Sequence, residues 1–272
     1  MLYNIINSDY TIIIILLFWK MTKTASQWRN SLGTCKSREY KGHRSKVHSL
    51  GWNCNGSKLA SASTDHAIRI WSLERLLGRD PVSSNELAGH IGSVEQLAWS
   101  PVDEHLLASV STDRTVRFWD TSAAANAALV ATIPTASENI NLAWSRDGRL
   151  LAVGAKDDSI CIIDVSVRRI VTQTGFGPVE INEIAWSAAG DELFLTRGSG
   201  VIDIVAVEMS ETGSGLGVTM GLKQTLAGHT ANCYCIRFTP NGRHFAVGGA
   251  DAIVTLWETL SLACTRTLCR LE

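Results

Sequence analysis

Three segments of the chain repeat one order of residues at almost constant spacing. The histidine of a Gly-His pair is followed after nine positions by an aromatic residue, after thirteen or fourteen more by an aspartate, and after six more by a tryptophan. The segments read His43, Trp52, Asp65, Trp71; His90, Trp99, Asp113, Trp119; and His229, Phe238, Asp251, Trp257. Repeats of about 40 to 45 residues with these marks are typical of β-propellers, in which each repeat is a four-stranded blade. The sequence therefore predicts an all-β fold.

Two further segments keep the spacing without the Gly-His pair. They read Trp144, Asp157, Ile163 and Trp186, Ser199, Val205. With them the pattern predicts one WD40 propeller domain over residues 35–272 with about five four-stranded blades. The blades are expected near residues 42–88, 89–134, 135–175, 176–227 and 228–269.

The repeats also bring together four residue types that can share hydrogen bonds. The sets are His43, Ser61, Asp65, Trp71; His90, Ser109, Asp113, Trp119; and His229, Asp251, Trp257, with Val247 at the serine position of the third. We expect each set to be a structural hydrogen-bond tetrad, in which a buried histidine links the hydroxyl, the carboxylate and the indole N–H.

A serine, a histidine and an aspartate can also be the nucleophile, base and orienting group of a hydrolase. An enzyme needs one such set in one cleft, whereas here the set recurs from blade to blade. Val247 would remove the nucleophile of the third set, but in a structural tetrad it removes only one hydrogen bond, at a cost of about 1 kcal/mol. The pattern favours a protein that is not an enzyme, with no catalytic residues.

Composition bears on which ligands to expect. The net charge of -1 gives no general attraction to nucleic acid, so RNA contact would come through a partner or a local basic patch such as residues 36–46. Seven scattered cysteines without a C-x-x-C pair argue against a zinc site and a disulfide framework. We therefore expect no metal, no cofactor and no small-molecule substrate.

Protein partners are the remaining expectation. Gly213, Gly215 and Gly217 lie between expected strands and do not open a helix, so the segment Glu208–Gly221 is interpreted as a flexible surface loop and not as a phosphate site. Exposed positions able to anchor a partner are Arg44, His66, Arg114 and this loop.

The first residues differ from the rest. The apolar run Ile12–Trp19 is shorter than the roughly 20 residues needed to span a bilayer, and no Lys or Arg precedes it as in a signal peptide. We expect residues 1–34 to be an N-terminal extension outside the propeller, with residues 1–20 disordered or artefactual and Met21 as the functional start. A membrane-tethered propeller is the alternative.

Several segments resemble one known family. They are KVHSLGW at 46–52, ENINLAW at 138–144, AVGAKDD at 152–158, VEINEIAW at 179–186 and NCYCIRF at 232–238. They are similar to the THO complex subunit 3 family of WD40 proteins, over about residues 38–272. The resemblance implies a nuclear, non-catalytic scaffold subunit of the THO part of the transcription-export (TREX) complex, acting in mRNA packaging and export. Implied partners are other THO/TREX subunits, with RNA contacted indirectly and no membrane.

Two alternatives stay open at this point. Gly-His and Trp-Asp marks occur in many propellers, so another WD40 adaptor, such as a chromatin reader or a ubiquitin-ligase substrate receptor, is possible. Members of the resembled family are similar to seven-bladed rings, so five blades here suggest an incomplete seven-bladed ring. In a closed ring the strand Cys35–Lys41 would complete the last blade.

Overall fold

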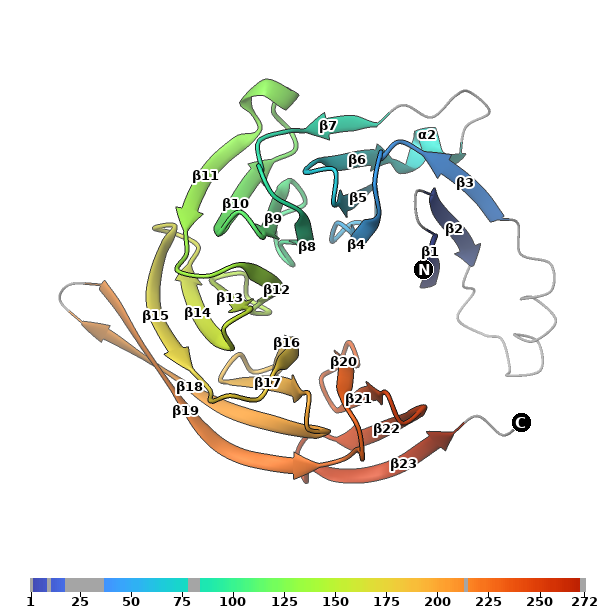
Figure 1. The fold of residues 1–272 in the computed structure, drawn as a ribbon. Helices are drawn as coiled ribbons and strands as arrows, with labels where there is room; N and C mark the ends of the chain where they lie inside the picture. The colour runs from blue at the N-terminus through green and yellow to red at the C-terminus, as the bar shows by residue number, and fades with distance from the viewer. Residues whose placement is uncertain (1, 9–10, 18–36, 78–83, 213–214, 270–272) are drawn as a thin grey trace.

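Five four-stranded antiparallel sheets follow one another around an arc in the computed structural model (Figure 1). The structure describes residues 2–8, 11–17, 37–77, 84–212 and 215–269. Within each sheet the strands lie in chain order, so that each blade is built from one continuous stretch of sequence. The predicted all-β propeller fold is confirmed.

The strands of the blades have the following bounds. Blade 1 comprises β4 (Val47–Trp52), β5 (Lys58–Ser63), β6 (Ile68–Ser72) and β7 (Asn85–Leu87). Blade 2 comprises β8 (Val94–Trp99), β9 (Leu106–Ser111), β10 (Thr115–Asp120) and β11 (Leu129–Pro134). Blade 3 comprises β12 (Asn139–Trp144), β13 (Leu150–Ala155), β14 (Ser159–Asp164) and β15 (Arg169–Gly175). Blade 4 comprises β16 (Ile181–Trp186), β17 (Glu192–Arg197), β18 (Val201–Thr212) and β19 (Gly215–Ala227), and blade 5 comprises β20 (Cys233–Phe238), β21 (His244–Gly249), β22 (Ile253–Glu258) and β23 (Ala263–Cys269).

The apolar core lies between neighbouring blades. Ile68 and Ile70 of blade 1, for example, share one buried cluster with Val94, Leu97 and Trp99 of blade 2. In blades 1, 2 and 3 the second strands read as nearly continuous runs of buried small and branched residues, as expected of sheets that are covered on both faces. Blades therefore stabilise one another mainly as nearest neighbours.

Indole groups at the ends of the innermost strands connect the blades. Trp99 Nε1 donates to the carbonyl oxygen of Gly51 at 2.9 Å, and Trp144 Nε1 donates to that of Ala98 at 3.0 Å. Trp186 repeats the contact, at 3.0 Å from the carbonyl oxygen of Ala143. In blades 2, 3 and 4 the tryptophan at the aromatic position of the repeat thus donates a hydrogen bond to the preceding blade.

Residues 2–8 and 11–17 form strands that the sequence did not predict. Strands β1 (Leu2–Ser8), β2 (Thr11–Leu17) and β3 (Ser37–Lys41) form an antiparallel sheet in the order β1-β2-β3. Residues 2–8 and 11–17 therefore differ from the expected disordered extension, and their Ile-rich composition suits a strand. The strand expected at Cys35–Lys41 begins at Ser37 and pairs with β2, while Cys35 lies outside the described residues.

The segment Glu208–Gly221 is not the flexible loop that its glycines suggest. Strands β18 and β19 continue as a two-stranded arm in which Glu208 pairs with Thr219 and Ser210 with Gly217. Val207 and Val218 are buried in one cluster with residues of blade 3, so the arm packs against the neighbouring blade (Figure 1). This apolar contact holds the arm in place despite its glycines.

Helices are short and peripheral in the part of the chain that the structure describes. α2 (Leu73–Leu77) follows the third strand of blade 1, and a 3-10 turn covers Ala125–Ala127. None of the helices found there has the length and apolar character needed to cross a membrane.

Candidate functional site

The two tetrads that contain a serine are complete in the structure. In blade 1, His43 Nε2 lies 2.7 Å from Ser61 Oγ, and the indole N–H of Trp71 donates to the same oxygen at 2.9 Å. His43 Nδ1 lies 3.0 Å from Asp65 Oδ2. A carboxylate can only accept, so Nδ1 carries the proton and Nε2 accepts from the serine hydroxyl. The four groups thereby satisfy one another inside the blade.

Blade 2 repeats this geometry. His90 Nε2 lies 2.8 Å from Ser109 Oγ, and Trp119 Nε1 donates to that oxygen at 2.8 Å. His90 Nδ1 is 2.8 Å from Asp113 Oδ2. Ser109 is fully buried, as is the serine of blade 1, so neither hydroxyl is accessible to a substrate.

Blade 5 keeps the tetrad geometry although it lacks the serine. Val247 pairs in register with Thr255 of the next strand, and Thr255 Oγ1 lies 2.9 Å from His229 Nε2. Trp257 Nε1 donates to the same hydroxyl at 2.8 Å, and His229 Nδ1 lies 3.0 Å from Asp251 Oδ1. The hydrogen bond expected to be lost with Val247 is therefore supplied by Thr255, which sequence spacing alone did not reveal.

The glycines of the Gly-His pairs in blades 1 and 5 make room for the tetrad tryptophan. A Cβ at Gly42 would lie 2.7 Å from Cη2 of Trp71, and one at Gly228 would lie 2.9 Å from Cζ2 of Trp257. Real Cβ atoms do not approach ring carbons so closely. The Gly-His pair and the distant tryptophan are thus one packing unit.

Burial sets the charge of the tetrads. It lowers the pKa of His43 and of His90 below the ordinary value, although the neighbouring aspartates act in the opposite direction. Burial also acts to raise the pKa of Asp65, but the N–H of Arg44 and the histidine outweigh it and the pKa is lowered. Neutral histidine beside ionised aspartate is consistent with the hydrogen-bond directions.

Blades 3 and 4 replace the tetrad. In blade 4, the buried Arg197 forms an ion pair with Asp203 (Nε to Oδ2 3.3 Å), and Arg197 Nη2 donates to the carbonyl oxygen of Phe176 at 2.7 Å. Sequence reasoning missed this pair, although charges at the facing ends of two apolar strands were a visible signal. In blade 3, Thr135 stands at the histidine position and Asp157 has no histidine partner.

All these turns lie on one rim of the arc, which we call the His–Asp rim. The residue after the aspartate position is left-handed in every blade, with φ values of 69°, 62°, 59°, 87° and 61° at His66, Arg114, Asp158, Gly200 and Ala252. The turns therefore hold His66 and Arg114 outward at fixed places, and both are exposed, as is Arg44. The fourth predicted anchor, Glu208–Gly221, belongs to the arm instead.

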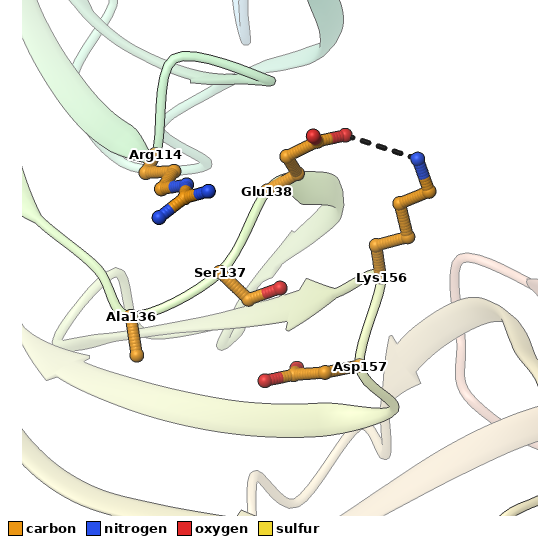
Figure 2. A pocket seen from close by; sticks show the side chains of 6 residues that line it. All are labelled: Arg114, Ala136, Ser137, Glu138, Lys156 and Asp157. Carbon is orange, nitrogen blue, oxygen red and sulfur yellow. Dashed lines mark hydrogen bonds and ion pairs between the residues drawn. The ribbon is translucent and has the colours of Figure 1, made fainter.

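A pocket opens on this rim between blades 2 and 3 (Figure 2). It has a volume of about 250 Å³ and is lined by Arg114, Ala136, Ser137, Glu138, Lys156 and Asp157. The Arg114 guanidinium and the Asp157 carboxylate both point into it, while Glu138 pairs with Lys156 at 3.2 Å. Among the described residues, no three His, Cys, Asp or Glu side chains are grouped to hold a metal ion.

Comparison with known proteins agrees with the fold. The WD domain, G-beta repeat, matches residues 33–72, 81–120 and 220–258, and the WD40 domain of anaphase-promoting complex subunit 4 matches residues 126–189. "THO complex subunit 3" of Arabidopsis thaliana is 42% identical over 236 residues, which are 87% of this chain and 70% of the relative. The chain belongs to the THO complex subunit 3 family of WD40 proteins.

Other relatives of this THO complex subunit 3 family member are more distant. "WD repeat-containing protein AAC3" of Dictyostelium discoideum is 32% identical over 86% of the chain, which spans 50% of that relative. "Cell division cycle 20.1, cofactor of APC complex" of Arabidopsis thaliana is 34% identical over 41% of the chain and 24% of its own length.

Proposed function

We propose that this protein is a non-catalytic scaffold subunit of a THO complex, the part of the transcription-export (TREX) assembly that acts in mRNA packaging and nuclear export. It works in the nucleus and holds other THO/TREX subunits. The observation that carries the proposal is 42% identity to a THO complex subunit 3 over 87% of the chain.

The buried tetrads support a structural and not a catalytic role. The hydroxyls of Ser61 and Ser109 are enclosed between a histidine and an indole, without solvent access. A nucleophile must reach its substrate within a cleft. The repetition of the tetrad in blades 1, 2 and 5 is explained by its role in connecting the rim turns to the strands.

The His–Asp rim is the docking surface that we favour for a partner subunit. Its turns are fixed by buried hydrogen bonds, so the backbone that carries the exposed Arg44, His66 and Arg114 is ordered before binding. Preorganisation of this kind lowers the entropic cost of association. The rim also carries the pocket between blades 2 and 3.

RNA is reached through partners in this proposal. The net charge is -1, and the carboxylates of Glu138 and Asp157 stand among the cations of the rim. Phosphate binding depends on dense positive charge, and neighbouring carboxylates oppose it. Lys41 of β3 and Arg44 and Lys46, which precede β4 of blade 1, are exposed, but they form only a small basic patch.

A second candidate is an adaptor of the anaphase-promoting complex class. It is favoured by the match of residues 126–189 and by the similarity to a relative named as a cofactor of that complex. That similarity covers 41% of the chain, against 87% for the THO relative, and so ranks below it.

Affinity purification tests the proposal. The tagged chain is purified from nuclear extract, with and without ribonuclease, and its partners are identified by mass spectrometry. We expect other THO subunits in near-equal amounts, unchanged by ribonuclease. Their absence, or their loss with RNA, would contradict the proposal, and anaphase-promoting complex subunits in their place would establish the second candidate.

A further inference from the structure

The pocket between blades 2 and 3 lies beside the turn that carries Thr135, the residue at the position of the histidine in blades 1, 2 and 5. In blade 5 the histidine's backbone N–H donates to Gly200, the left-handed residue of the preceding blade, at 3.1 Å. Thr135 N donates to Arg114, the left-handed residue of blade 2, at 2.8 Å. Thr135 and His229 therefore occupy equivalent places in their blades.

Among the described residues, one carboxylate oxygen of Asp157 lacks the partner that the tetrad aspartates have. In blades 1, 2 and 5 the aspartate Oδ2 accepts the backbone N–H that follows the histidine, namely those of Arg44, Ile91 and Thr230, at 2.8, 3.1 and 3.1 Å. Asp157 uses only Oδ1, which accepts the Ser159 N–H at 3.2 Å and hydroxyl at 2.7 Å. Among the residues that the structure describes, nothing hydrogen-bonds Asp157 Oδ2, which is accessible from the pocket.

Arg114 and Asp157 have no ion-pair partner among the described residues, whereas the other two charges of the pocket neutralise each other. Glu138 and Lys156 form their ion pair at 3.2 Å, whereas Arg114 has no side-chain partner within the described part of the chain. Arg114 and Asp157 are not an ion pair with each other. The pocket thus offers one cationic and one anionic group at separate points (Figure 2).

The walls of the pocket are fixed by backbone hydrogen bonds. Lys156 N donates to the Glu138 carbonyl oxygen at 2.8 Å, and Thr135 N to that of Arg114. The two charged groups are therefore carried by turns that are already connected to each other. A ligand would have to order the exposed side chains but not the turns that carry them.

We propose that this pocket binds a protein segment that carries a lysine or arginine side chain beside an acidic one. The cationic head group pairs with Oδ2 of Asp157, and the carboxylate pairs with the Arg114 guanidinium. A volume of about 250 Å³ fits such side chains but not a folded element. The inference rests on the proposed scaffold function and names the partner chemistry of its rim.

The charge pattern disfavours the other classes of ligand. A nucleic-acid phosphate or a free anion would meet Arg114 but also the carboxylates of Glu138 and Asp157. A simple cation would meet Arg114 and Lys156. Only a ligand with both signs satisfies the two unpaired groups together.

Selection from a display library of random nonapeptides tests the inference on the purified full chain. We expect enriched peptides with a lysine or arginine within a few positions of an aspartate or glutamate. The best peptide is then fluorescein-labelled and titrated by anisotropy. Asp157→Asn and Arg114→Ala should each weaken its binding by about tenfold or more, the usual effect of losing one hydrogen bond to a charged group.

Two matched controls exist on the opposite rim of blade 3. Asp164 Oδ1 accepts the Ser166 N–H and hydroxyl at 2.9 and 2.6 Å, the same local turn as at Asp157, so Asp164→Asn controls for loss of the turn. Arg168 is exposed at φ 52°, like Arg114 at φ 62°, so Arg168→Ala controls for backbone strain. Both controls should bind the peptide as the unchanged chain does.

The outcomes separate this inference from the proposed function. Failure to enrich charged pairs, or equal binding by the pocket variants and their controls, would overturn the inference. If THO subunits still co-purify in that case, the scaffold proposal stands without it. A random RNA library is selected on the chain in parallel. If RNA is enriched in place of peptides and its binding is weakened by Arg114→Ala, the inference would also be overturned.

Discussion

At the residue scale, the position of a hydroxyl matters more than the residue that supplies it. In blades 1 and 2 the oxygen between the imidazole and the indole belongs to a serine on the second strand. In blade 5 it belongs to Thr255 on the third strand, opposite Val247. A buried indole N–H and imidazole nitrogen need that oxygen, since leaving them unsatisfied is costly.

The replacement of a serine by Thr255 as the source of this hydroxyl can be tested by moving the hydroxyl from position 255 to position 247. Thr255→Val should lower the free energy of unfolding by about 1 to 3 kcal/mol, because two buried groups lose their partner. Thr267→Val, on the exposed facing position of β23, should change it by less than about 0.5 kcal/mol. Adding Val247→Ser to Thr255→Val should recover most of the loss in urea unfolding. A double variant as unstable as Thr255→Val would contradict this account.

The tetrad histidines also predict a dependence of stability on pH. Burial lowers the folded-state pKa of His43 and His90 from 6.5, so below that pH the unfolded chain takes up protons first. Stability should be constant above about pH 7.5 and fall as the pH decreases through 6.5, by at most about 1.4 kcal/mol per unit for each histidine. Thermal unfolding between pH 8 and 5 measures it.

A control variant isolates the tetrad contribution to that slope. His43→Gln with His90→Gln should make the decrease between pH 7 and 5 shallower, whatever its effect on absolute stability. An unchanged slope would place the titration elsewhere. The lowered pKa values of Asp65 and Asp113 act in a separate window, near and below 3.8, where stability is lost as these carboxylates are protonated.

At the scale of elements, the arm formed by β18 and β19 is the largest addition to the repeated blade. Its buried residue Val218 shares a cluster with Ile160 and Ile162 of blade 3. Val218→Ala should lower the free energy of unfolding by about 1.5 to 3 kcal/mol through lost burial and a small cavity. Thr219→Ala, at the exposed neighbouring position, is the control, and an equal effect of both changes would mean that the arm does not pack in solution.

The sequence predicted those elements whose marker residues contact the same blade or the neighbouring one. The Gly-His, aromatic and aspartate spacing places each blade, because these residues clamp neighbouring strands and blades. It failed at the arm, where glycines suggested a loop although Val207, Val218 and Met220 supply an alternating apolar face. It also failed for Thr255, Arg197 and Asp203, since the exchange of a partner across strands depends on register, which no single sequence segment contains.

At the scale of the whole molecule, the residues that stabilise the arc of blades differ from those that we expect to bind partners. Apolar packing and tryptophan clamps connect neighbouring blades, while the His–Asp rim carries exposed charges on turns fixed from within. The pocket between blades 2 and 3 lies beside blade 3, one of the two blades that lack the rim histidine. Blade 3, which lacks the buried tetrad, thus carries on its surface a pocket suited to binding a partner.

Cross-linking of lysines in the purified nuclear complex tests the docking claim most directly. Lys46 and Lys156 lie on the His–Asp rim, whereas Lys58, at the other end of β5, and Lys223, beside Glu192, lie away from it. The account predicts that cross-links from this chain to its partner subunits concentrate on Lys46 and Lys156. Partner cross-links confined to Lys58 and Lys223, with the rim lysines modified only by hydrolysed reagent, would contradict it.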